Sequence, residues 1–94
     1  MENTEYIDEY LAIVFGTKDK AEIAERILGS PTLSGVRDAY NDYEKFCTVR
    51  AYKTVPAHVF MNYVCEEYRL FRKLEQYVTP KGTTAGKTVF CKED

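Results

Sequence analysis

The stretch 54–78 has the most regular apolar pattern in the chain and constrains the fold more than any other segment. Its apolar side chains recur at steps of three and four residues, which places them on one stripe of a helix. Thr54 is a suitable N-cap, and Pro56 is tolerated in a first helical turn. Such a helix is roughly 35 Å long and needs partners along its whole stripe. The stripe consists of Phe60, Tyr63, Val64, Leu70, Phe71, Leu74, Tyr77 and Val78.

A second amphipathic segment, 31–52, predicts the partner of this helix. Ser30 and Pro31 form a helix-start signal, and apolar residues then recur at alternating steps of three and four from Leu33 to Cys47. Only two or three residues near position 53 separate the two predicted helices. A connection that short makes them antiparallel neighbours. We therefore expect a long antiparallel helical hairpin, about 31–52 and 55–78.

Shorter elements complete the predicted fold. Apolar spacing predicts two short N-terminal helices, 4–15 and 18–28, with Gly16 ending the first. Residues 79–94 are rich in Thr, Gly, Pro and Lys, which predicts an irregular C-terminal tail, flexible or docked, with a short strand at 88–91 as an open alternative. The sequence thus predicts an all-α fold, a small helical bundle in which residues 1–78 form a single helical domain.

Composition limits the classes of function. The chain has 94 residues and a net charge of −2, which argues against nucleic acid as the main partner. Cys47, Cys65 and Cys91 are an odd set without a close pair, so neither a disulfide framework nor a zinc motif is indicated. The first residues are acidic, where a signal peptide is basic, and no apolar run approaches a membrane span of about 18 residues. We expect a cytoplasmic protein without a membrane partner.

No motif for catalysis, a metal or a cofactor stands out. His58 and Cys65 are seven residues apart, about 10 Å along a helix, which is too far for a Cys–His pair. The segment 82–88 has three residues between its glycines, where a phosphate-binding loop has four. The spacing of the acidic, histidine and cysteine residues matches no metal site. The sequence therefore predicts that the protein is not an enzyme and has no cofactor.

Aromatic and basic residues point to binding. Eight tyrosines are many for so small a core, and tyrosine at a surface edge is a common anchor in protein interfaces. In the predicted helical hairpin, Arg37 lies beside the helical turn 69–72 of the second helix. This arrangement predicts a basic patch, and the alternative is that these side chains form only a solvated face. We expect a protein-interaction module, that is, a regulator, adaptor or inhibitor whose partner is another protein. Pairing of its aromatic helical stripes also predicts a homodimer. The predicted partner-binding residues are Arg37, Arg69, Arg72, Lys73, Tyr52 and Tyr68.

A second function is implied by a resemblance. The segment 21–43, which contains IAERILGSP, resembles the helix-turn-helix of bacterial repressors. The repressor motif has a small residue four positions before the glycine of its turn, whereas Ala24 is five positions before Gly29. The helix that would read the bases contains more acidic than basic side chains, and phosphates repel acidic side chains. The resemblance implies a DNA-binding regulator through residues 21–43 as the alternative.

Overall fold

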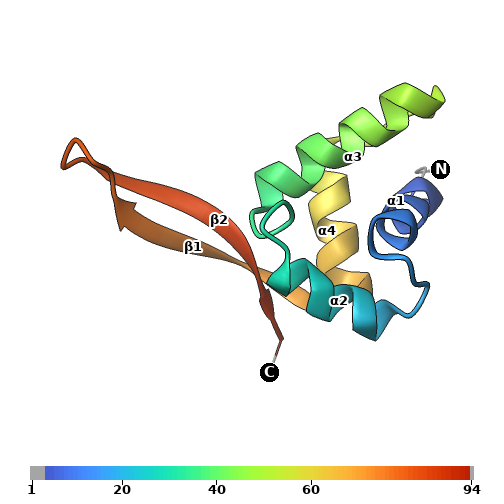
Figure 1. Ribbon diagram of the computed structural model, residues 1–94, viewed down its shortest axis with the longest axis horizontal. Coiled ribbons are helices and arrows are strands. Elements are labelled where there is room, and N and C mark those ends of the chain that lie inside the picture. Colours follow the sequence, from blue (N-terminus) through green and yellow to red (C-terminus); the bar gives the residue numbers. More distant parts are fainter. Residues whose placement is uncertain (1–3, 94) are drawn as a thin grey trace.

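The computed structural model describes residues 4–93 and shows a mixed α/β fold (Figure 1). The prediction of an all-α bundle is therefore wrong. Four helices form one body, and a two-stranded antiparallel hairpin projects from it along the longest dimension, 42 Å. The elements are α1 (Glu5–Phe15), α2 (Lys20–Gly29), α3 (Val36–Arg50), α4 (Ala57–Glu67), β1 (Leu70–Val78) and β2 (Thr84–Lys92).

The predicted helix 55–78 is divided between two kinds of structure. Its first half forms α4, which ends at Glu67, and Arg69 then adopts a left-handed backbone with φ 55°. The second half is β1, which pairs with β2 from Leu70 opposite Lys92 to Val78 opposite Thr84. Residues 84–92, predicted as part of an irregular tail, are thus the second strand of the hairpin.

The residues of β1 suit a strand as well as a helix, and this is why their helical spacing gave a wrong prediction. Leu74, Tyr77 and Val78 fit a helical stripe, yet each is more than half exposed, so no helical seam forms there. The aromatic and β-branched residues of β1 and β2 favour paired strands. Between the strands, Thr79 N–H donates to Thr83 O at 2.9 Å, and Gly82 has φ 81°, a conformation suited to glycine. Residues 79–83 therefore act as a hairpin turn.

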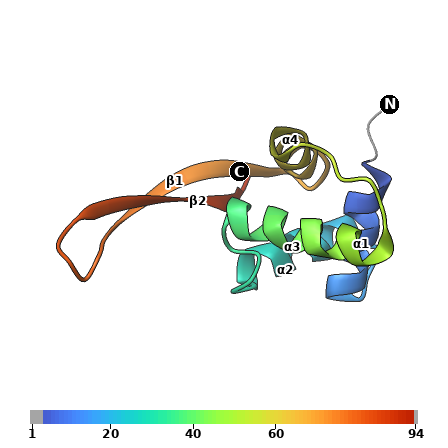
Figure 2. The ribbon, with the colours of Figure 1, turned by 90° about the horizontal axis from the view of Figure 1, so that it is seen from above.

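The predicted antiparallel pair of long helices is also absent from the described residues. Six residues, 51–56, connect α3 to α4, and the view in Figure 2 runs nearly along α4 while α3 lies across it. Two tyrosines of α3 hold this connection. Tyr40 donates its hydroxyl to Val55 O at 2.7 Å, and Val55 N–H donates to the Tyr43 hydroxyl at 3.2 Å. The helices therefore cross instead of lying side by side.

The two short N-terminal helices lie close to their predicted positions and close the core. Gly16 ends α1 in a left-handed conformation, and Asp19 caps α2 by accepting from Ala21 N–H at 3.0 Å. The centre of the core is aromatic, with the rings of Tyr43 and Phe60 4.9 Å apart. Every helix supplies buried residues, and the base of the hairpin adds Leu70 and Phe90.

One backbone bridge fixes the start of α3 to the hairpin. Gly35 pairs with Val89 of β2, so β2 lies between this bridge and β1. A Cβ at Gly35 would lie 2.9 Å from Lys87 Cε, which shows how closely the two segments approach. Residues 31–34 bend toward this bridge with Leu33 fully buried, so α3 begins at Val36 and not at the predicted residue 31.

Candidate functional site

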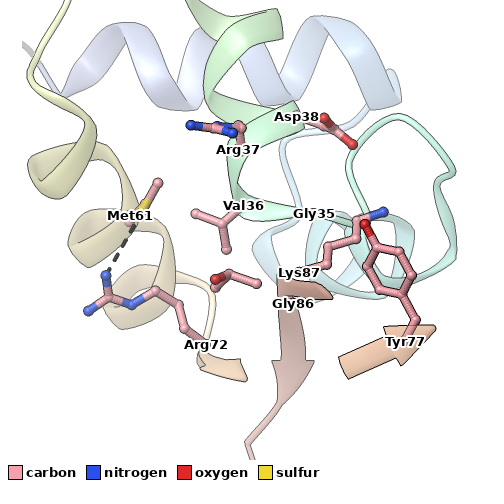
Figure 3. A pocket seen from close by; sticks show the side chains of 10 residues that line it. Gly35, Val36, Arg37, Asp38, Met61, Arg72, Tyr77, Gly86 and Lys87 are labelled. Carbon is pink, nitrogen blue, oxygen red and sulfur yellow. Dashed lines mark hydrogen bonds between the residues drawn. The ribbon is translucent and has the colours of Figure 1, made fainter. Parts of the chain in front are cut away.

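A groove of about 560 Å³ separates the start of α3, the side of α4 and the hairpin (Figure 3). Arg37 enters it from α3, Arg72 from β1 and Lys87 from β2. Among residues 4–93, Asp38 is the one acidic residue that lines it. The groove exists because the Gly35 bridge holds the start of α3 against β2 while β1 leaves the end of α4.

The cations of this groove carry little compensating charge. The ion pairs among residues 4–93 are Lys20–Glu67, Arg26–Glu22 and Lys92–Glu25, and each includes a residue of α2. Arg37, Arg72 and Lys87 are thus outside every ion pair of the described part of the chain. The hairpin 70–92 contains five basic residues and one acidic residue, Glu75, whereas the N-terminal helices are acidic. A positive surface is therefore concentrated on one end of an acidic protein.

The exposed side of α4 carries neutral polar groups over most of its length and two carboxylates, Glu66 and Glu67, at its end. His58 and Asn62 are exposed and stand four residues apart, on one line along the helix. Arg72 spans from β1 to this helix: its Nη2 donates to Asn62 Oδ1 at 3.3 Å and its Nη1 to Met61 Sδ at 3.9 Å. The guanidinium thereby orients Asn62 and leaves the amide N–H groups of that side chain available as donors.

The predicted basic patch is only partly assembled. Arg37 and Arg72 line the same groove, although the helical hairpin from which this was predicted does not form. Arg69 is exposed at the turn between α4 and β1, and Lys73 is exposed on β1. Neither lines the groove.

The two predicted tyrosine anchors serve the fold. The Tyr52 ring is stacked on Tyr6 with 4.2 Å between centroids, and its hydroxyl donates to Glu9 Oε1 at 3.2 Å. Tyr68 is 4 % exposed and donates to Asp8 Oδ1 at 2.6 Å, while Tyr63 donates to Asp8 Oδ2 at 2.5 Å. Burial, then the hydrogen bond to Asp8, raises the pKa of both Tyr63 and Tyr68. These bonds fasten α4 to α1.

Sequence reasoning missed Lys87 and Asn62 as site residues. Lys87 lies in the segment 82–88, whose spacing does not match a phosphate-binding loop, and no motif singles out Asn62. The missed signal was the turn sequence TPKGT between two stretches rich in β-formers, which is typical of a β-hairpin. Recognition of that hairpin would have placed Lys87 beside β1.

His58 is exposed on α4 and not enclosed in a pocket, and Cys47, Cys65 and Cys91 are free thiols. Within residues 4–93, no three His, Cys, Asp or Glu side chains are grouped so as to hold a metal ion. None of the described helices has the length and apolar content that crossing a bilayer requires.

Comparisons with protein-family models, with curated proteins and with solved structures found no match to this chain.

Proposed function

We propose that this protein binds duplex DNA through α4 and the adjoining basic groove, without catalysing a reaction. The supporting observation is that the exposed side of α4 is flanked by Arg37, Arg72 and Lys87, none of which forms an ion pair within the described chain. Two carboxylates lie near these three cations, since Asp38 lines the groove and Glu75 is opposite Lys87 in the hairpin. Cations at that position attract phosphates, and the polar side chains between them are of the kinds that read base edges. Asn62 in particular carries an amide of the kind that pairs with adenine.

The order of elements supports the same proposal. From α2 onward, the chain forms a helix, then the short segment with the Gly35 bridge, then the crossing helices α3 and α4. The hairpin of β1 and β2 comes last, and β2 pairs with Gly35. This order resembles that of winged helix-turn-helix domains, in which the second of the two crossing helices enters the major groove. In this proposal that helix is α4, not the second helix of the segment 21–43 from which the sequence resemblance was drawn. The acidic side chains of α3 are then no obstacle, because α3 does not read the bases.

Salt-dependent binding tests this proposal. Fluorescence anisotropy with a labelled duplex of mixed sequence is expected to show an affinity that falls steeply with salt, because bound phosphates release counterions. Arg72→Ala should weaken binding and reduce the salt slope by about one unit. Lys18→Ala, which removes an exposed lysine near α1 and α2, is the matched control and should change neither. Duplex binding that is absent at low salt, or equal losses in both variants, contradicts the proposal.

Base contacts are tested separately from phosphate contacts. Asn62→Ala is expected to reduce discrimination among duplexes selected from a random library, by about 1–3 kcal/mol at the affected position. It should leave the salt slope of binding to unselected DNA nearly unchanged, because Asn62 carries no charge. A variant that selects the same sequences as the original chain would exclude a base contact by Asn62.

A protein-interaction module is the second candidate, and one observation favours it. Phe71, Leu74, Tyr77 and Val78 are large apolar residues on β1, and each is between 45 % and 71 % exposed. Apolar side chains gathered on one strand mark an interaction surface. Their exposure is compatible with DNA binding through α4, because the groove and α4 supply the phosphate contacts.

A further inference from the structure

The outer edge of β1 is open for pairing. β2 occupies one side of β1 and also forms the bridge to Gly35, and within residues 4–93 no strand pairs with the other side of β1. Bulges, prolines and charged side chains such as lysine are the usual means by which proteins protect such an edge. The charged residues of β1 include both signs, Lys73 and Glu75, which a second strand can pair. The register of β1 with β2 is continuous, and β1 contains no proline. β1 is therefore a free template for another strand.

The direction of the backbone groups follows from the two ends of the ladder. Thr79 N–H donates to Thr83 O at 2.9 Å, and Glu93 N–H donates to Arg69 O at 3.2 Å. Both bonds continue the register of the hairpin, and on the β1 side both involve odd-numbered residues. Because backbone groups alternate in direction along a strand, the even-numbered residues of β1 direct their N–H and C=O groups outward.

We propose that β1 pairs antiparallel with β1 of a second copy of this chain, about a two-fold axis at Leu74. Leu74 then lies opposite Leu74 of the second copy in a hydrogen-bonded pair. Lys73 lies opposite Glu75 of the second copy, and Phe71 lies opposite Tyr77 of the second copy. These two pairs are non-hydrogen-bonded pairs, whose Cα atoms are only about 4.5 Å apart, so their side chains meet closely. The symmetry makes each of them occur twice.

Charge selects this register over its neighbours. Moving the axis by one residue places Lys73 opposite Lys73, or Glu75 opposite Glu75, and like charges directly opposite each other are destabilising. An axis between two residues instead places even-numbered residues opposite odd-numbered residues of the second copy. The backbone groups of the odd-numbered residues point toward β2, so the hydrogen bonds between the two copies are lost. Only the axis at Leu74 satisfies three conditions together: the outward backbone groups bond each other, Lys73 faces Glu75, and Phe71 faces Tyr77.

The position of the hairpin leaves room for this pairing. β1 and β2 project clear of the helices (Figure 1), and antiparallel pairing puts the two helical bodies at opposite ends of a four-stranded sheet. The pairing covers β1 side chains that are otherwise exposed, led by Val78 at 71 % and Leu74 at 60 %. It does not use α4, but it shares β1 with the proposed DNA site, because Arg72 and Tyr77 of β1 line the groove.

Sedimentation of complementary charge variants tests the pairing. The full chain is expected to sediment as a dimer of twice 10.9 kDa at about 100 µM. Lys73→Glu and Glu75→Lys should each raise the dimer dissociation constant about tenfold or more, because each sets like charges opposite each other in both symmetric pairs. Glu75→Lys also sets a lysine opposite Lys87 of its own β2, so Lys73→Glu is the cleaner of the two single variants. An equimolar mixture of the two variants restores opposite charges at every pair and should dimerise. The control mixture of Lys45→Glu and Glu44→Lys, changed at exposed positions of α3, should match the original chain.

Each alternative outcome overturns the pairing. A chain that stays monomeric at that concentration, variants that dimerise as well as the original, or a mixture that stays monomeric would each exclude it. Far-UV circular dichroism of each variant identifies loss of the hairpin, and variants that fail this check are replaced by the cysteine test below.

A cysteine test reads the register directly. In a chain with Cys65→Ser and Cys91→Ser, Leu74→Cys places two thiols opposite each other at a Cα separation of about 5.5 Å, which suits a disulfide. A covalent dimer is expected on oxidation. Gln76→Cys is the control, since its two copies stand four residues apart along the strands, about 13 Å, and should not crosslink. Equal crosslinking of both variants contradicts an axis at Leu74.

Discussion

The hydroxyl of Tyr43 fixes the crossing of α3 and α4, and Tyr43→Phe tests its contribution. Val55, whose N–H donates to this hydroxyl at 3.2 Å, is 3 % exposed, and Tyr43 itself is fully buried. The substitution keeps the ring against Phe60 but leaves a buried N–H without an acceptor, which costs about 1–3 kcal/mol. For a domain of this size, each kcal/mol lowers the melting temperature by roughly 4–8 °C. A decrease on the order of 10 °C is therefore expected.

Urea and thermal unfolding, followed by far-UV circular dichroism, measure this effect. Tyr77→Phe is the matched control, because Tyr77 is 51 % exposed and its hydroxyl forms no hydrogen bond with the described residues. Its free energy of unfolding should stay within about 0.5 kcal/mol of that of the original chain. If Tyr43→Phe unfolds at the same midpoint as Tyr77→Phe, the Tyr43–Val55 bond does not hold the connection, and the account of the crossing helices is wrong.

Three further predictions concern stability. Asp8→Asn should lower the free energy of unfolding by about 2 kcal/mol, because the carboxylate accepts two tyrosine hydroxyls that one amide oxygen serves less well; chemical denaturation measures this. Phe90→Ala should cost about 3–5 kcal/mol and detach the hairpin base, seen as faster amide exchange in β1 and β2. Burial raises the pKa of Tyr43 to about 12, so the folded chain keeps a proton that the unfolded chain releases near pH 10. Its contribution should be complete below about pH 10 and be lost as the pH rises toward 12. Tyr43→Phe should therefore make the urea midpoint fall less over that range, and the remaining fall comes from Tyr10, Tyr63 and Tyr68, whose pKa values burial also raises.

The helical part of the fold was more predictable than the hairpin because its signals are local. Gly16 and the residues before α2 mark helix ends within a few positions of where they occur. The segment after Glu67 carries spacing that suits both a helix and a strand, and the decision between them comes from β2, about 14 residues further along the chain. A pattern in one segment does not contain that pairing. The turn sequence between the strands was the one local sign of it.

The candidate site was predictable only as far as its charges. Arg37 and Arg72 were selected because of their charge, and they do meet in one groove, but Lys87 arrives there only through the Gly35–Val89 bridge. Of the tyrosines chosen as surface anchors, Tyr68 is buried and Tyr52 is half-buried, and their hydroxyls donate to Asp8 and Glu9 of α1. Because their hydrogen-bond acceptors lie on α1, which is far away in the sequence, Tyr52 and Tyr68 stabilise the fold.

The two proposals together predict how the protein distinguishes short from long DNA. With the axis at Leu74, the two copies of Leu70 stand about eight residues apart along paired strands, roughly 26 Å, and α4 ends just before each. This separation is close to one turn of duplex DNA, about 34 Å, so a dimer would present two α4 helices to neighbouring major grooves. Leu74→Pro removes only an outward N–H and no bond to β2, and it leaves the charge unchanged. We expect it to bind a 10-base-pair duplex like the original chain but to lose the tighter binding to a 25-base-pair duplex that two linked sites provide.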